Sequence, residues 1–272
     1  MNQENSITKE SFTKIGLLGA ALVIFLIGLT LGARGLAAAW SLGPGGAIIF
    51  SGVLPALLVI AATAGIEKLL SARRWAECLE SIGLGRPHFG QLKASALCLL
   101  PIAVAYLGMI FAFGISLTAQ ANLPWLIIKI FVSQGIGEEV VFRGLVFRHL
   151  RSGRSFWRAA TLSAAVFSIV HLAGLLRGFS VGNLFDVAIS IGFSFLMGYA
   201  MAHLFEAGGG TIWGCTLLHV GIDSTNWFSG AGDTQFSPGN IVYMLGIIVA
   251  SGMAFWAILR TPPETQRLCD NV

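Results

Sequence analysis

The chain has 272 residues, of which 55% are hydrophobic and only 11% are charged, and its mean hydropathy is +0.78. These values lie well outside the range of soluble domains and predict an all-α, polytopic integral membrane protein. The net charge of +4 does not indicate a nucleic-acid partner, because the Lys and Arg residues are scattered at the ends of apolar runs instead of forming one stripe.

Apolar runs that approach the roughly 20 helical residues needed to cross a membrane follow one another along the chain. We expect about eight transmembrane helices, at residues 15–33, 47–66, 94–117, 125–147, 159–173, 186–205, 211–228 and 240–259.

Between the second and third spans lies the longest polar segment, 67–93, which is expected to form a surface helix and a loop. The expected organisation is an N-terminal membrane region (1–123), a core in which the middle four helices form a conical bundle (124–229), and a last span with a short tail (230–272).

The basic residues predict the orientation, because cytoplasmic ends of spans carry the excess of Lys and Arg. With a cytoplasmic N-terminus, 13 of the 17 basic residues fall on the inside. Only Arg34 and Arg177 fall outside, and Lys129 and Arg143 lie within the fourth span. We therefore expect both termini in the cytoplasm and the protein in the cell membrane.

The fourth span carries two adjacent acids, Glu138 and Glu139, and the base Arg143. An ionised side chain inside a membrane costs roughly 2.5 to 3.5 kcal/mol on insertion scales, so it needs a partner or a function. Glu139 and Arg143 are spaced i, i+4 and can pair on one helix face. Glu138 lies about 100° around the helix and is left as a candidate general base. The alternative is that both acids only hold helices together.

Two further polar pairs lie on later spans, again at i, i+4 spacing: Phe167 with His171, and His219 with Asp223. Alone, His171 could be a packing histidine, and His219 with Asp223 could bind a metal, orient each other or only satisfy each other. Counted from the expected cytoplasmic border, however, Glu138, His171 and His219 all lie roughly 15 to 20 Å deep. A common depth favours a single buried site.

The same residues resemble the three motifs of the CPBP family, which comprises CAAX proteases and bacteriocin-processing enzymes and is also called the Abi family. The resemblance covers about 124–229, and the motifs, in chain order, are Glu138-Glu139-x-x-x-Arg143, Phe167-x-x-x-His171 and His219-x-x-x-Asp223. It implies a glutamate-dependent intramembrane protease, a hydrolase similar to CAAX prenyl endopeptidases, with no cofactor. Its substrate would be a peptide or lipid-modified protein that enters from the bilayer.

The resemblance also implies a role for each motif. Glu138, with His171, would activate the attacking water, and Glu139 with Arg143 would support that carboxylate. His219 would donate to the oxyanion. Asp223 stands where CAAX proteases usually have Asn; an ionised Asp has no proton to donate, so we expect it to be protonated or to orient His219.

Other functions are compatible with the same residue types. A zinc protease with Glu138, His171, His219 and Asp223 as ligands is permitted by residue type but disfavoured, because no H-E-x-x-H motif is present. A proton-coupled transporter would use buried acids and histidines as a relay, although no internal repeat is visible. A non-catalytic bacteriocin self-immunity factor is the other alternative.

Overall fold

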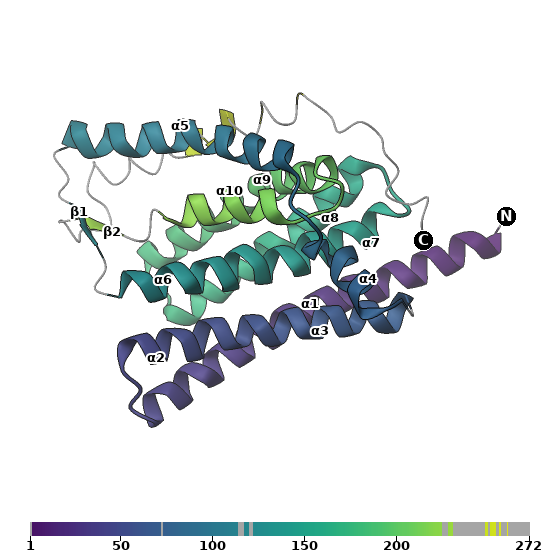
Figure 1. The fold of residues 1–272 in the computed structure, drawn as a ribbon, viewed down its shortest axis with the longest axis horizontal. Coiled ribbons are helices and arrows are strands. Elements are labelled where there is room, and N and C mark those ends of the chain that lie inside the picture. Colours follow the sequence, from purple (N-terminus) through teal and green to yellow (C-terminus); the bar gives the residue numbers. More distant parts are fainter. Residues whose placement is uncertain are drawn as a thin grey trace.

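The structure is a computed structural model that describes residues 2–71, 73–113, 117–119, 122–224, 228–230, 248–249, 251–253, 256 and 260 (Figure 1). Within them the elements are α1 (Asn2–Ala39), α2 (Pro44–Ile48), η1 (Ile49–Val53), α3 (Leu54–Ser71), α4 (Trp75–Leu79), η2 (Glu80–Leu84), α5 (Phe89–Phe113), β1 (Leu117–Ala119), α6 (Leu123–Lys129), η3 (Ile130–Glu138), η4 (Val140–Phe147), α7 (Arg148–Arg151), α8 (Phe156–Ile169), η5 (Val170–Arg177), α9 (Val181–Ala207), α10 (Trp213–Asp223) and β2 (Phe228–Gly230).

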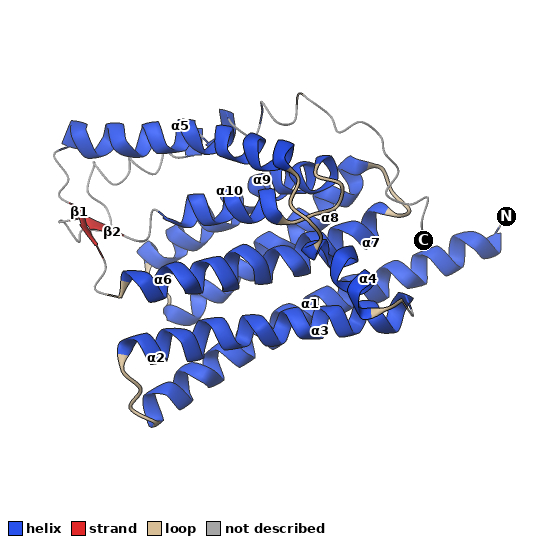
Figure 2. Ribbon diagram, in the orientation of Figure 1, coloured by secondary structure: helices blue, strands red, loops and turns tan. Residues whose placement is uncertain are grey.

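The helices form one bundle around a central helix that runs without a break from α6 through η3 and η4 to α7 (Figures 1 and 2). α10 packs against η3 and is covered by α5, α3 packs against both η3 and η4, and α8 and α9 pair with each other. The turn between α1 and α2 lies at one end of the bundle, and α4 and α7 lie toward the other (Figure 1). The all-α, membrane-protein fold expected from the sequence is confirmed.

Four helices in the described part of the chain are long and apolar enough to cross a membrane: Pro44–Ser71, Trp75–Ala105, Phe156–Leu176 and Val181–Ala207. They correspond to four of the expected spans, and the spans expected at 159–173 and 186–205 are separate helices on either side of residues 178–180. The total of eight is not confirmed. In the first span only the shorter run Ile27–Ala39 is detected, and most of 240–259 lies outside the described residues.

The span expected at 211–228 is shorter than predicted. α10 has 11 residues, and at 1.5 Å per residue it is roughly 16 Å long, about half of the hydrocarbon thickness of a bilayer. One apolar face of α10 is buried against neighbouring helices, since Cys215, Leu218 and Ile222 are all at most 7% exposed, whereas Leu217 is 37% exposed. Hydropathy alone does not distinguish such a buried half-length helix from a membrane span.

Within the polar segment 67–93, which was expected to form a surface helix and a loop, the structure has the short helix α4 and some side chains that are buried. Glu67 is 1% exposed at the end of α3, where it accepts from His149 (Nε2–Oε2 2.9 Å) and pairs with Arg148. Farther along, Ile82 is fully buried. The buried Glu67 carboxylate pairs with Arg148 and His149 of α7. This part of the segment therefore packs onto the end of the central helix.

A small antiparallel sheet, which the sequence did not predict, joins β1 to β2 with Leu117 opposite Gly230 and Ala119 opposite Phe228. It lies at the end of the bundle near the start of α6 (Figure 1). The backbone pairing thus ties the segment before α6 to the segment after α10.

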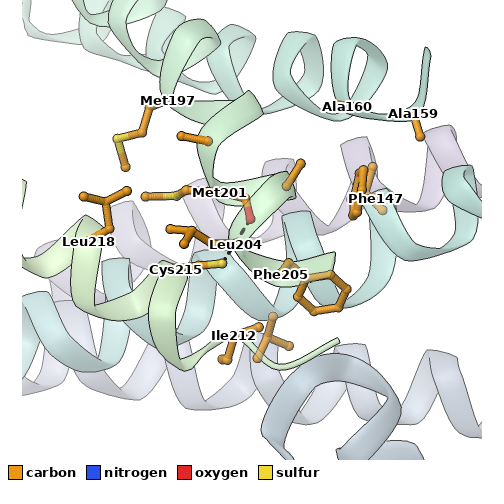
Figure 3. Close-up of a cluster of buried hydrophobic side chains, with 14 of the residues drawn as sticks. Phe147, Ala159, Ala160, Met197, Met201, Leu204, Phe205, Ile212, Cys215 and Leu218 are labelled. Carbon is orange, nitrogen blue, oxygen red and sulfur yellow. Dashed lines mark hydrogen bonds between the residues drawn. The ribbon is translucent and has the colours of Figure 1, made fainter. Parts of the chain in front are cut away.

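The largest buried apolar cluster lies where α9 and α10 meet the end of the central helix (Figure 3). The Phe147 and Phe205 rings meet edge to face with centroids 6.0 Å apart, and Cys215 donates its Sγ–H to the Met201 carbonyl at 3.2 Å. Such dense packing fixes the position of α10, which carries His219, relative to the helix that carries the two glutamates.

Candidate active site

The central helix changes its winding at the two glutamates. It is π-helical over η3, which ends at Glu138, and again over η4, which begins at Val140. π-helical turns are rare and are frequently found at functional sites, although η1 and η2, which carry none of the motif residues, are also π-helical. The two neighbouring acids face different surroundings, since the Glu138 side chain is 23% exposed and that of Glu139 is fully buried.

Glu139 and Arg143 form the ion pair that their i, i+4 spacing predicted. Arg143 Nη1 donates to Glu139 Oε1 at 3.3 Å, and Nε lies 3.2 Å from Oε2, with both side chains at most 1% exposed. The guanidinium also lies over the Phe167 ring, 4.5 Å from its centroid. Removing one member of such a buried pair leaves the other charge uncompensated, at a cost of about 3 to 5 kcal/mol.

His219 is the point at which the first and third motifs meet. Its Nδ1 lies 2.7 Å from Glu139 Oε1, and because an ionised carboxylate only accepts, Nδ1 carries the proton. Its Nε2 faces two other carboxylates, Glu138 Oε2 at 4.0 Å and Asp223 Oδ2 at 3.8 Å. The sequence suggested that Asp223 fixes the tautomer of His219, but in the structure Glu139 makes that contact. Glu139 thus contacts His219 and also pairs with the charge of Arg143.

The second motif joins the site through an aromatic ring. Phe167 packs edge to face against His171 and His219, with centroid distances of 5.5 and 5.9 Å. His171 lies in the 3₁₀ turn that follows α8; its Nδ1 is 3.3 Å from the Phe167 carbonyl, and its Nε2 is 3.0 Å from Ser194 Oγ. The structure thus brings all three motifs together. The Glu138 carboxylate makes its ionic contact with His219, and the side chain of His171 forms its hydrogen bond with Ser194.

Ser194 is the site neighbour that the sequence reasoning missed. It lies on α9, is 5% exposed, and has no motif around it that would distinguish it from any other serine in an apolar helix. Thr216 is a second such residue, because its hydroxyl donates to the Gly135 carbonyl at 2.7 Å and fixes α10 on the central helix beside the glutamates.

A comparison with protein-family models identifies the core of the chain. Residues 119–225 match the model described as type II CAAX prenyl endopeptidase Rce1-like. The chain carries an Rce1-like domain, and the resemblance to the CAAX protease family inferred from the three motifs is confirmed. A search of curated proteins gives no match.

The Rce1-like domain contains every residue of the three motifs and begins at the end of β1. It therefore comprises the central helix, α8, α9 and α10, whereas α1, α3 and α5 pack around it from outside the matched range. The family is one of membrane proteases, and the apolar helices of this chain agree with an integral membrane location.

Within the described residues, no three His, Cys, Asp or Glu side chains are grouped so that they could hold a metal ion. Around His219, the carboxylate oxygens of Glu138 and Asp223 lie 4.0 and 3.8 Å from Nε2, so two carboxylates face the same ring nitrogen.

Proposed function

We propose that this protein is an intramembrane endopeptidase in which Glu138 activates the attacking water. Glu138 is the member of the acid pair that is partly exposed, while Glu139 is fully buried and engaged with Arg143 and His219. That division of environment within a domain of a membrane-protease family is the observation that carries the proposal.

In the proposed reaction, Glu138 takes one proton from water as the oxygen attacks the scissile carbonyl carbon. His219 donates from Nε2 to the resulting oxyanion, and the carboxylates of Glu138, Glu139 and Asp223 complement a positive charge on its ring. The proton held by Glu138 then passes to the leaving nitrogen as the C–N bond breaks, which yields a carboxylic acid and an amine.

His171 is proposed to assist Glu138 in positioning the water. With Nδ1–H donated to the Phe167 carbonyl, its Nε2 has a lone pair that accepts from Ser194 Oγ. A water molecule that enters the site would take the place of the Ser194 hydroxyl at this lone pair. His171 and Glu138 would then contact the water from two sides, from α8–η5 and from the central helix.

The proposed substrate is a membrane-associated peptide or protein tail, with CAAX-type prenylated proteins as the first class to test because of the family match. We propose the cell membrane as the location, with both termini in the cytoplasm, on the basis of the distribution of basic residues.

Peptide profiling in cells tests the proposed function. Membranes from cells that express the wild-type chain or the Glu138→Gln variant would be compared by mass spectrometry of protein C-termini. We expect new C-termini that depend on Glu138 and that persist when a zinc chelator is added. Identical peptide profiles for the two proteins would contradict the proposal, and loss of the new C-termini with chelator would favour a metalloprotease.

A further inference from the structure

Gln134 is a polar residue of the central helix that the three motifs do not include. It lies in η3, four residues before Glu138, and is partly exposed. Its amide oxygen Oε1 is nevertheless covered, and no group in the described part of the chain donates a hydrogen bond to it. A buried acceptor without a donor costs free energy. Gln134 therefore holds an unused hydrogen-bonding group close to the proposed active site.

The neighbours of Gln134 on η3 show which way its side chain points. A Cβ added at Gly135 would lie 2.7 Å from a side chain of α10, whereas one added at Gly137 would lie 3.4 Å from a side chain of α3. Ile136 packs against the largest buried apolar cluster. At about 100° per residue, Gln134 lies about 200° from Ile136 around the helix. It therefore points away from that cluster, on the side of the helix between α10 and α3.

Glu138 occupies the same side of the helix. Four residues come within about 40° of a full turn for α-helical or π-helical winding, so the Gln134 and Glu138 side chains leave the helix in nearly the same direction. The rise between them is at most about 6 Å. Both residues are partly exposed, and His219 Nε2 lies 4.0 Å from the Glu138 carboxylate. Gln134 is thus one turn from the reacting groups, on their open side.

The Gln134 carboxamide matches what an unwound peptide requires. Within a bilayer, every backbone N–H and C=O needs a partner that the protein supplies. In an extended chain, the N–H and C=O of one residue point to the same side, where a neighbouring strand exchanges two hydrogen bonds with them. A carboxamide carries the same pair of donor and acceptor. Its last torsion has a broad preference, so rotation can turn Oε1 toward a substrate.

We propose that the Gln134 carboxamide binds the N–H and C=O of one substrate residue and so holds the peptide extended beside Glu138. This inference rests on the proposed function and adds a binding residue to it. An extended peptide covers about 3.3 to 3.6 Å per residue, so the bound residue lies within about two residues of the scissile bond. A trapped water molecule could also donate to Oε1, but the open side shared with Glu138 favours the substrate.

Binding measurements on the Glu138→Gln protein in nanodiscs test this proposal without catalysis. The probe is a fluorescent peptide that carries a farnesylated cysteine, together with a series in which one backbone N–H at a time near the cysteine is replaced by an ester oxygen. We expect one ester to bind about fivefold more weakly than the parent peptide. When Gln134→Met is added, that ester and the parent should bind equally. The control Ser133→Ala removes a hydroxyl about 100° around the helix and should leave the fivefold difference intact.

Three results would overturn the inference: equal binding of all the peptides when Gln134 is present, a difference that survives Gln134→Met, or no saturable binding of the parent peptide. Equal binding would assign Oε1 to a water molecule. Methionine is close to glutamine in length and helix propensity, so the thermal unfolding temperature should not change. Gln134→Asn keeps a shorter carboxamide and should retain part of the difference.

Cleavage by the protein that keeps Glu138 is a separate readout. A fivefold binding difference without any Glu138-dependent cleavage would contradict only the proposed function. Glu138-dependent cleavage with the same ratio of parent to ester rates in the wild-type protein and in Gln134→Met would contradict only the role of Gln134.

Discussion

At the scale of single residues, the two adjacent glutamates differ in what touches them. Glu139 contacts Arg143 and His219 and is fully buried, whereas Glu138 lies 4.0 Å from His219 Nε2 and part of its side chain is exposed. In the proposed mechanism, Glu139 holds the site together while Glu138 exchanges protons. This separation of tasks gives distinct expectations for the residues around His219 and His171.

Asp223→Asn is expected to retain or raise peptidase activity. The Asp223 carboxylate lies 3.8 Å from His219 Nε2, beyond hydrogen-bond distance, and Glu139 already holds the ring through Nδ1. An amide at position 223 would add an N–H donor near the oxyanion. Initial cleavage rates of the two proteins provide the measurement, and complete loss of activity in the variant would show that the carboxylate itself is required.

Ser194→Ala is expected to lower kcat about tenfold and to leave KM nearly unchanged, because His171 loses the hydroxyl that fixes Nε2 at 3.0 Å. Ser194→Thr, which keeps a hydroxyl, should recover part of the rate. A serine 3.0 Å from an imidazole is also the geometry of a nucleophile and its base. Two results together would favour a serine nucleophile over an activated water. A fluorophosphonate would label the wild-type protein at Ser194, and Ser194→Ala would lower the cleavage rate as much as Glu138→Gln does.

At the scale of elements, the central helix is held in place by a close approach to η2. A Cβ built at Gly144 would collide with the carbonyl oxygen of Ile82 and lie 2.7 Å from its carbonyl carbon. Backbone atoms cannot move aside as a flexible side chain can, so only glycine fits at this crossing.

Gly144→Ala is therefore expected to lower the free energy of unfolding by about 1 to 3 kcal/mol, as overpacking of a core typically does. The measurement is thermal unfolding in detergent. Gly192→Ala is a matched control, because nothing lies within 4 Å of a Cβ at that helical position, and alanine there should be neutral or slightly stabilising. Equal unfolding temperatures for Gly144→Ala and the wild-type protein would contradict the close crossing.

Sequence reasoning succeeded at this scale where the cause is local. The Glu139–Arg143 pair follows from i, i+4 spacing, and the long apolar helices α8 and α9 follow from hydropathy. It failed where a distant segment decides the outcome. The burial of Glu67 depends on Arg148, some 80 residues later, and the contact between His171 and Ser194 depends on how α8 and α9 pack. No local pattern marks either contact.

At the scale of the whole molecule, the orientation in the membrane is a prediction that labelling can test. Ser152, after α7, and Phe179, before α9, are both exposed, at opposite ends of α8 and η5. The background for labelling is Cys269→Ser, in which the remaining native cysteines, Cys78, Cys98 and Cys215, are all buried. In intact cells, an impermeant maleimide should label Phe179→Cys and spare Ser152→Cys until the membrane is opened; the reverse pattern would invert the orientation.

The most direct test of the central claim, that Glu138 activates the water, is single-turnover cleavage of a prenylated peptide by the purified protein and by Glu138→Gln in nanodiscs. The substitution keeps the shape of the side chain and removes its ability to take a proton, so we expect a cleavage rate at least about 10²-fold lower with peptide binding and thermal unfolding unchanged. An unchanged cleavage rate in Glu138→Gln would show that Glu138 does not activate the water.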